Sequence, residues 1–466
     1  MTDGDLEDPR QYTRITARLV SEGQRVCVFL DETQDVHHLA NGVADEIIRL
    51  LDRDIIPSFE QSIGTFKDID GDGKLTVLLT PWLSHLQGGR TSIGGCARSA
   101  DFLGGRSPFS NRRDMLYLNS NVRPGSALRD LISHEYTHVV SFSERLAMRP
   151  IQLITLGDWL NEGIAHLSEP TKTNIDYRVA EFLDRPQDFP LAVENYYHAG
   201  LWRSHGCRGA TYLFLRWCEL QRGESLARRL IRSPRSSKAA ISTVMNRQFE
   251  DLFRAWNVSL ADASFHAMPT KTSHELLPDR FGRHGLAGVH WKQQTTAKPF
   301  ETQIKPTATA FIELVPQDVA GQQNLHLKAS KPNQLQLTLI RIPASWPKIK
   351  IDCHRLRSSD SSDEWMEVSI RNKGRSPLTL QHVSYQCNNQ RLPSKFLGTD
   401  DLTGQGVEVL RVNAEARLRF PLPANAKEST WRIHVVGKDS NGRRATAHTK
   451  LQSARETQPI VVATNR

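Results

Sequence analysis

Two histidines four residues apart, with a glutamate beside the first, stand in the stretch His134-Glu135-Tyr136-Thr137-His138. Residues at positions i and i+4 of a helix project from the same face, so both imidazoles can bind one metal ion. A glutamate at the second position of this pattern is suited to take a proton from the attacking water in metal-assisted hydrolysis. The pattern predicts zinc bound by His134 and His138, with Glu135 as the general base.

A helix has to hold these residues, and the sequence favours one over residues 126–142. Ser126 follows Pro124-Gly125 and is a suitable N-cap. Apolar residues recur at helical spacing on one side of the segment: Leu128, Leu131, Ile132, Val139 and Val140. The two histidines are therefore expected on a helix that packs against a core.

A catalytic zinc ion usually takes three protein ligands and leaves a fourth position to water, so a third ligand is needed. A second helical pattern, residues 158–169, places Glu162 24 positions after His138. Two histidines from one helix and a glutamate from the next form the arrangement called gluzincin. His166 follows Glu162 by one turn and could compete as a ligand, although a packed or surface histidine is the simpler interpretation.

These motifs resemble the hyicolysin-type metallopeptidases, a family of secreted bacterial gluzincins. The resemblance rests on residues 134–138 and on WLNEG at 159–163, with weaker flanking matches over about 25–261. It implies a zincin fold and peptide-bond hydrolysis, with a peptide or protein as substrate. It also implies zinc ligation and catalysis by the residues already singled out: His134, His138, Glu162 and Glu135. The sequence contains no G-x-M-E-N stretch of the kind that grips a substrate N-terminus, which favours an endopeptidase.

Gluzincins commonly place a tyrosine or histidine opposite the metal, where it donates a hydrogen bond to the oxyanion of the tetrahedral intermediate. In this chain the corresponding region reads HGCRGATY at 205–212, so the candidates are His205 and Tyr212. The family often has Tyr-Gly where this chain has His205-Gly206. Tyr212 precedes an apolar helix, where an aromatic side chain is usually part of the core.

A zinc-bound histidine usually donates its other ring N–H to a carboxylate or carbonyl group. Asp158 and Glu169 flank the Glu162 helix and are candidates for this role; the alternative is that both are solvent-facing acids at helix ends. The glycine-rich stretch 88–105 is expected to be a loop that borders the cleft, before a strand at 115–118. A sheet edge there could pair with an extended peptide, and the alternative is a structural surface loop.

A second candidate metal site lies in DIDGDGK, residues 68–74. Asp68, Asp70 and Asp72 alternate as in an EF-hand loop, with a glycine at the sharp turn, which indicates calcium. The twelfth position is Leu79 instead of a glutamate, and 75–80 has the pattern of a strand instead of a helix. A plain Asp-Gly turn before a core strand fits these residues equally well.

Composition limits the other possibilities. Hydrophobic residues make up 38% and charged residues 24% of the chain, which is typical of a soluble globular protein. Lys and Arg number 60 against 51 Asp and Glu, without basic tracts interleaved with aromatics, so nucleic acid is not an expected partner. No apolar run approaches the ~20 residues of a membrane-spanning helix, so no membrane insertion is expected.

The first twenty residues contain no hydrophobic segment of a signal peptide. A start further upstream, export by another route and retention inside the cell all remain open, whereas the resemblance implies a location outside the cytoplasm.

The 466 residues suffice for about two to four domains. We expect an α+β zincin-like metallopeptidase domain followed by all-β, sandwich-like modules. The first domain should open with a strand at 26–30 and a helix at 43–59, and 335–340 should be a strand of the β-rich part. The expected divisions are an N-terminal arm, the zincin domain, a small β module, an immunoglobulin-like sandwich and a tail: residues 1–24, 25–265, 266–345, 346–455 and 456–466. Cys353 and Cys387 fall in the β-rich part, where they could bridge two strands.

The predicted function is that of a zinc-dependent endopeptidase. The alternative is a non-catalytic zinc-containing binding or surface protein that acts through its β modules. Glu135 argues against this alternative, because a structural zinc site needs ligands but no general base.

Overall fold

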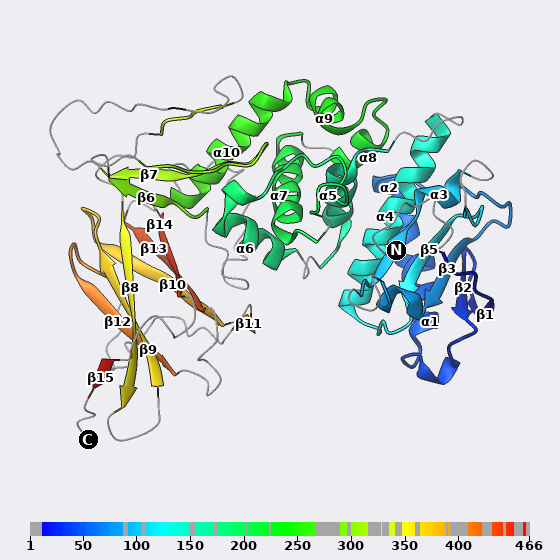
Figure 1. Ribbon diagram of the computed structural model, residues 1–466, viewed down its shortest axis with the longest axis horizontal. Coiled ribbons are helices and arrows are strands. Elements are labelled where there is room, and N and C mark those ends of the chain that lie inside the picture. Colours follow the sequence, from blue (N-terminus) through cyan, green and yellow to red (C-terminus); the bar gives the residue numbers. More distant parts are fainter. Residues whose placement is uncertain are drawn as a thin grey trace. The chain divides into compact units, whose positions relative to one another are not determined.

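The structure is a computed structural model, shown in Figure 1. It describes the following residues: 12–86, 92–103, 109–148, 155–171, 175–201, 203–222, 225–265, 289–295, 300–315, 328, 335–340, 347–358, 364–387, 390–391, 409–421, 431–440, 444–451 and 460–462. The chain divides into two compact units. Unit 1 comprises residues 1–178 and 191–249, and unit 2 comprises 179–190 and 250–466. Unit 1 is a mixed α/β structure, whereas unit 2 is built mainly from β-sheets.

Unit 1 contains a five-stranded sheet in the order β1-β2-β3-β5-β4. Its strands are β1 (Ala17–Glu22), β2 (Val26–Asp31), β3 (Leu75–Thr80), β4 (Gly95–Ala97) and β5 (Met115–Asn119). Strands β2, β3 and β5 are parallel, and β1 and β4 pair antiparallel at the two edges. All six residues of β3 are buried, as expected of a central parallel strand that is covered on both faces. The strands predicted at 26–30, 75–80 and 115–118 are confirmed, and β1 lies within the stretch predicted as an arm.

The helices that precede the metal motif are α1 (Val43–Arg49), a π-helical segment Leu50–Ile55, α2 (Ile56–Ser62) and the short α3 (Ser99–Phe102). The first three are continuous and confirm the helical pattern predicted at 43–59. The later helices are α4 (Ser126–Met148), α5 (Asp158–Ser168), α6 (Asp176–Asp184), α7 (His205–Arg222), α8 (Leu226–Ile231), α9 (Ser237–Met245) and α10 (Phe249–Phe265). Short 3₁₀ segments occupy Val36–His38, Pro81–Ser84 and Pro186–Asp188. Among the described helices, none is both long and apolar enough to cross a membrane.

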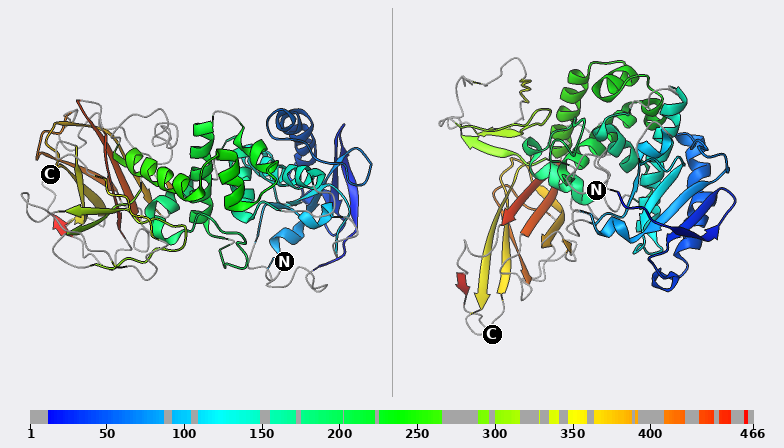
Figure 2. Two further views of the ribbon diagram at one scale, coloured as in Figure 1. Left: turned by 90° about the horizontal axis from the view of Figure 1, so that it is seen from above. Right: turned by 45° about the vertical axis from the view of Figure 1, so that its right-hand side comes forward.

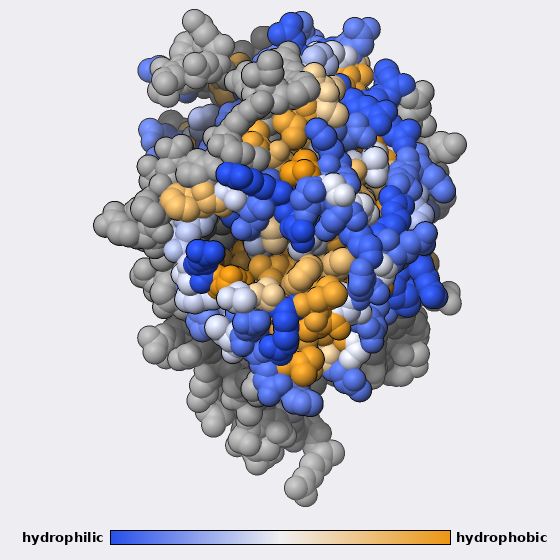
Figure 3. Space-filling view, turned by 90° about the vertical axis from the view of Figure 1, so that its right-hand side faces the viewer, coloured by the Kyte–Doolittle hydropathy of each residue, from blue (hydrophilic) through white to orange (hydrophobic). Residues whose placement is uncertain are grey.

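Helix α4 lies along the sheet and contacts β4 and β5, while α1 contacts β1 and β2 (Figure 2). Ile132, Tyr136 and Val139 of α4 are completely buried. A separate apolar cluster contains Leu78 and Met115 from the sheet. Seen from the right-hand side of Figure 1, the molecule shows apolar side chains gathered among hydrophilic ones (Figure 3). The predicted packing of α4 on a core is confirmed.

Unit 2 contains two four-stranded sheets, in the orders β11-β10-β13-β14 and β12-β9-β8-β15. Their strands are β8 (Ile349–Ser358), β9 (Glu364–Asn372), β10 (Leu378–Cys387), β11 (Gln390–Arg391), β12 (Glu415–Pro421), β13 (Trp431–Asp439), β14 (Arg444–Leu451) and β15 (Ile460–Val462). One apolar cluster takes Val368 and Ile370 from β9 and Ile433 and Val435 from β13, so the two sheets share a core. Strands β6 (Lys292–Thr295) and β7 (Ile312–Val315) form a parallel pair.

Several local predictions were wrong. The described residues 335–340 form no strand, although their apolar side chains alternate. The stretch 88–105 was predicted as a loop, but its described part contains β4 and α3; residues 88–91 and 104–105 lie outside the described residues. A bridge between Cys353 and Cys387 was only a possible alternative to free thiols, and Cys353 is a free thiol. These two cysteines belong to different sheets, on β8 and β10 respectively.

Helices α5 and α7 approach each other closely at a glycine. A Cβ atom added to Gly163 would lie 2.5 Å from Thr211 Cγ2 and 2.7 Å from Leu215 Cδ1. Both distances are below van der Waals contact, and Thr211 and Leu215 are completely buried. The glycine therefore lets the backbone of α5 approach α7 directly beside Glu162.

Replacing Gly163 with alanine is expected to destabilise the protein by about 1–3 kcal/mol, because the added methyl overpacks a closed interface. Helix propensity alone would act in the opposite direction, since alanine is favoured over glycine by about 1 kcal/mol inside a helix. The sign of the change in unfolding free energy, measured by denaturant titration, separates the two effects. Adding Thr211→Ser, which removes Cγ2 and keeps the hydroxyl, should recover part of the loss. A stabilising Gly163→Ala would contradict the packing described above.

Candidate metal centre

Helix α4 places the three residues of its motif in a buried position. His134, Glu135 and His138 are 9%, 6% and 6% exposed. The two imidazole rings lie one turn apart, with centroids separated by 5.0 Å. Both rings project from the same face of α4, and α4 is itself held against the sheet. The positions of the two histidines therefore depend on a single packed helix. The predicted juxtaposition of the two histidines is therefore present.

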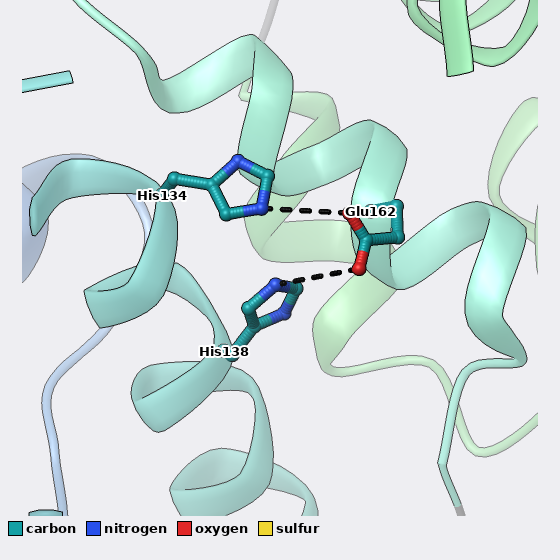
Figure 4. A group of neighbouring side chains, drawn as sticks. All are labelled: His134, His138 and Glu162. Atoms are coloured by element: carbon teal, nitrogen blue, oxygen red, sulfur yellow. Dashed lines mark ion pairs between the residues drawn. The ribbon is translucent and has the colours of Figure 1, made fainter. Parts of the chain in front are cut away.

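Glu162 reaches both histidines from α5 (Figure 4). Its Oε2 lies 3.4 Å from His134 Nε2, and its Oε1 lies 3.9 Å from His138 Nε2. One ligand atom from each of the three residues falls within 4.8 Å of the other two. Two imidazole nitrogens and a carboxylate oxygen at these separations can surround a single cation. The structure thus brings together the three residues that the sequence predicted as metal ligands.

Glu135 lies against the edge strand β4. A Cβ atom added to Gly95 would approach Glu135 Cγ to 2.9 Å. The same atom would lie 3.0 Å from the carbonyl oxygen of Tyr117, so there is no room for a side chain at this position. Strand β4 is outermost in the sheet and pairs with β5. The predicted base is therefore in contact with the sheet edge that an extended peptide could join.

Glu169, just beyond α5, contacts two buried histidines. Its Oε1 lies 3.0 Å from Nδ1 of His134 and 2.6 Å from Nδ1 of His166. A hydrogen bond from Nδ1–H of His134 to this carboxylate orients the ring so that Nε2 faces Glu162. Asp158, the other acid considered for this role, accepts the backbone N–H of Tyr196 at 2.8 Å instead.

His134, His166 and Glu169 form a second group whose ligand atoms lie within 4.8 Å of one another. His166 and Glu169 are only 1% and 3% exposed. Oε1 of Glu169 contacts Nδ1 of both rings, while Nε2 of His166 and Oε2 of Glu169 are buried and have no hydrogen-bond partner among the described residues. Glu162, in contrast, retains 21% of its side-chain exposure, and a catalytic metal needs an open position. The group with Glu162 is therefore the better candidate for a metal that acts on a substrate.

Helix α7 contributes a residue that the sequence interpretation missed. Nη1 of Arg208 lies 3.3 Å from Glu162 Oε2. His205, the first residue of α7, is exposed, and its ring lies 5.0 Å from that of Tyr177. Tyr212 is buried one turn beyond Arg208. His205, Arg208 and Tyr212 follow one another at helical spacings of three and four, which was the available signal for Arg208.

The buried charges of the site shift one another's titration. Burial raises the pKa of Glu135 to about 7, and the nearby charge of Glu162 acts in the same direction. Burial lowers the pKa of His138 to about 4. Burial opposes the charge of Glu162, but Arg208 and the two histidines outweigh it and hold the pKa of this carboxyl well below its usual range. Burial likewise opposes the charge of Glu169, yet hydrogen bonds from His134 and His166 lower its pKa to about 2.

At the predicted calcium loop, the three acids that converge are not the three suggested by the sequence. The acids that converge are Asp68, Asp70 and Asp114, with ligand atoms within 4.8 Å of one another. Oδ1 of Asp72 accepts the backbone N–H of Lys74 at 2.8 Å, and its Oδ2 lies 3.4 Å from Arg113 Nη2. The third member of the cluster is therefore Asp114, which immediately precedes β5.

Comparison with known proteins supports a relationship to metalloproteases. No family model matches the chain. A curated relative, the neutral metalloprotease ShpI of Staphylococcus hyicus, is 20% identical over 358 residues. These residues cover 71% of this chain and 74% of that protein. The chain is thus distantly similar to a metalloprotease, and its His/Glu cluster is a candidate metal site.

Parts of the chain are also similar to solved structures. A Bordetella pertussis protein named ApaA is 16% identical and covers 24% of this chain and 99% of its own, with a TM-score of 0.18. A CARDB domain from Pyrococcus furiosus, solved with di-metal ions, is 15% identical and covers 22% of this chain and 93% of its own, with a TM-score of 0.15. TM-scores this low carry no argument about the fold or function of this chain.

Replacing Glu169 with glutamine is expected to weaken metal binding by about 10–100-fold, because the carboxylate that orients His134 is lost. The measurement is competition for zinc against a chelating dye. Asp158→Asn is the matched control, since Asp158 caps a backbone N–H instead of contacting a histidine. An unchanged zinc affinity in Glu169→Gln, or an equal loss in Asp158→Asn, would contradict the role given to Glu169.

Proposed function

We propose that this chain is a zinc-dependent endopeptidase in which His134, His138 and Glu162 bind the metal and Glu135 is the general base. The observation that carries the proposal is the convergence of these three ligand groups beside a buried glutamate at a sheet edge. The distant similarity to neutral metalloprotease ShpI supports it independently. We further propose that unit 1 contains a zincin-like domain, because its sheet is followed by the histidine helix and then by the glutamate helix.

The chemistry of the site fits zinc. Two imidazoles and one carboxylate are a known ligand set for catalytic zinc, which also needs an open fourth position. Nδ1 of His138 and Oε2 of Glu162 are buried without a hydrogen bond among the described residues, although the latter oxygen lies near charged neighbours. A dication would compensate the negative charges of the buried Glu135 and of the partly exposed Glu162. Bound there, zinc would polarise the scissile carbonyl and increase the acidity of water.

Glu135 then has the role of moving protons. Its carboxylate takes a proton from the attacking water and transfers it to the amine that leaves. Glu169 holds His134 in the tautomer whose Nε2 faces the site, through the contact of 3.0 Å to Nδ1. Arg208, His205 and Tyr212 are the candidates on α7 for stabilising the oxyanion that develops during attack.

The edge strand β4 is where an extended peptide substrate would bind. Strand β4 is outermost in its sheet, and Gly95 brings its backbone against Glu135. A peptide that adds to this edge as a strand is held by main-chain hydrogen bonds, which do not depend on its sequence. Such a peptide would be bound along its length, as an endopeptidase requires.

Glu135→Gln is expected to lower the rate of peptide cleavage by about 10²–10⁴-fold and to leave zinc content and folding unchanged. The reason is that glutamine keeps the shape of the side chain but cannot accept the proton of water. Cleavage of casein or a quenched peptide is measured together with zinc content, with and without a chelator. A substrate with an acetylated N-terminus should be cut as well as a free one.

Glu144→Gln is the matched control, because Glu144 also lies on α4 but pairs with Arg232 at 2.9 Å. It should retain full activity. Stoichiometric zinc without cleavage of any peptide would favour a non-catalytic binding protein acting through the β modules. Loss of cleavage on N-terminal acetylation would indicate an aminopeptidase.

Arg208 on α7 lies 3.3 Å from Glu162, a candidate metal ligand. Its guanidinium is a rigid cation with several N–H groups, so one N–H could hold Glu162 while another donates to the substrate carbonyl. The electrostatic influence of Arg208 extends to Glu135, whose pKa it lowers against the larger effect of burial. We therefore place Arg208 beside the reacting carbonyl, in addition to the predicted His205 and Tyr212.

Arg208→Gln is expected to reduce kcat by about 10²–10³-fold while zinc affinity stays within a few-fold of the wild type. Arg208→Lys should restore only part of the rate, because lysine keeps the charge but not the planar fork. Arg216→Gln, on the same helix and paired with Glu219, is the control. If zinc affinity falls and the zinc-saturated enzyme keeps its kcat, Arg208 acts only by positioning Glu162.

A further inference from the structure

The acidic cluster at one end of the unit 1 sheet is distinct from the His/Glu centre. Asp68 and Asp70 belong to the exposed loop before β3, and Asp114 immediately precedes β5. Strands β3 and β5 are parallel neighbours in the register Thr76↔Met115, so the segments that precede them meet at the same end of the sheet. One carboxylate oxygen from each of the three acids lies within 4.8 Å of the others.

Asp114 differs from an ordinary surface acid in this cluster. Its side chain is completely buried, and its Oδ1 accepts the backbone N–H of Ile69 at 2.8 Å. Among the residues that the structure describes, no group donates a hydrogen bond to its Oδ2. A buried carboxylate oxygen without a partner is costly unless a proton or a cation compensates it. Burial, with a further contribution from the charges of Asp70 and Asp68, raises the pKa of Asp114 to about 7.

The neighbouring cation, the guanidinium of Arg113, does not supply the missing partner of Asp114 Oδ2. Nη2 of Arg113 contacts Asp70 and lies 3.4 Å from Asp72, while Nη1 donates to Thr76 Oγ1 at 3.1 Å. The positive charge of Arg113 thus compensates the negative charges of Asp70 and Asp72. Asp68 tightens the loop itself by accepting the backbone N–H groups of Gly71 and Gly73 at 2.7 and 3.1 Å. Neither arrangement supplies a donor to the buried oxygen of Asp114.

We propose that Asp68, Asp70 and Asp114 bind a calcium ion that fastens the 68–74 loop to the start of β5. Three carboxylates from an open loop suit calcium, which takes six to eight oxygen ligands at variable angles and can complete its shell with water. Magnesium demands a nearly ideal octahedron and is usually bound through only one or two carboxylates. Zinc prefers nitrogen and sulfur ligands, which this cluster lacks.

The site would stabilise unit 1 without taking part in peptide cleavage. Asp114 already joins the two segments, because its carbonyl oxygen accepts the N–H of Thr76 at 3.0 Å and its side chain accepts that of Ile69. A cation shared with Asp68 and Asp70 adds a third link at the same place. Strand β5 lies beside the edge strand β4, so a loosened β5 would loosen that edge as well.

The test is thermal unfolding of the full-length, zinc-loaded protein with calcium chloride as the probe. At about a hundred times its Kd, calcium should raise the unfolding midpoint of the wild type by about 5–10 °C. Asp114→Asn and Asp70→Asn should abolish this rise. Asparagine can still accept the N–H of Ile69, so Asp114→Asn should unfold no earlier than the wild type when calcium is absent, because a buried charge has been removed.

Asp72→Asn is the matched control, since it removes one charge from the same loop but none from the three ligands. It should retain most of the calcium-dependent rise. The proposal is overturned if calcium does not shift the wild-type midpoint, or if Asp114→Asn keeps the full shift. An equal shift with magnesium chloride would overturn the choice of calcium. Because unfolding is the readout, each of these results is independent of whether the His/Glu centre cleaves peptides.

Discussion

A carboxylate on one helix has to meet two imidazoles on another, and the packing of α5 determines whether it does. The histidines have little freedom, because they lie one turn apart on a buried helix that rests on the sheet. The position of Glu162 depends instead on how α5 is held, and Gly163 allows α5 to approach Thr211 and Leu215 of α7 directly. The same approach places Arg208 within 3.3 Å of Glu162. Close helix packing thus sets both the ligand geometry and its electrostatic surroundings.

The three glutamates of the centre have different partners, and the differences separate their roles. Glu169 is held between two imidazoles, and Glu162 faces the histidines and Arg208, so both stay ionised. Glu135 has the most weakly compensated charge, and burial raises its pKa to about 7. A general base must be free to accept a proton, whereas a ligand and an orienting group must remain charged. This division of partners is what the proposed chemistry needs from three identical side chains.

What the sequence could predict was local. Helical and strand periodicities located α4, α5, β2, β3 and β5, and the fixed i, i+4 geometry of a helix was enough to pair His134 with His138. Residues that meet only through the tertiary fold were not predictable in this way. Asp114 lies 45 positions from Ile69, and no periodicity connects it with the Asp68 loop. Which acid orients His134, Asp158 or Glu169, likewise depended on the path of the chain beyond α5. The alternating residues 335–340 show the converse, since a strand pattern forms a strand only where a neighbouring strand is available.

The edge strand β4 explains why the stretch 88–105 was predicted as a loop and why residue 95 has to be a glycine. A three-residue strand is too short to show alternation, and glycine weakens any strand signal. Yet a side chain at Gly95 would collide with Glu135 on one side and with the β5 backbone on the other. The glycine that conceals the strand in the sequence is therefore the residue that allows the sheet edge to touch the proposed base. An extended peptide could pair with that edge in several registers, and each register would place a different carbonyl group beside α4. The backbone contacts alone would therefore not select the bond to be cut. Selectivity would then have to come from the surfaces that receive its side chains.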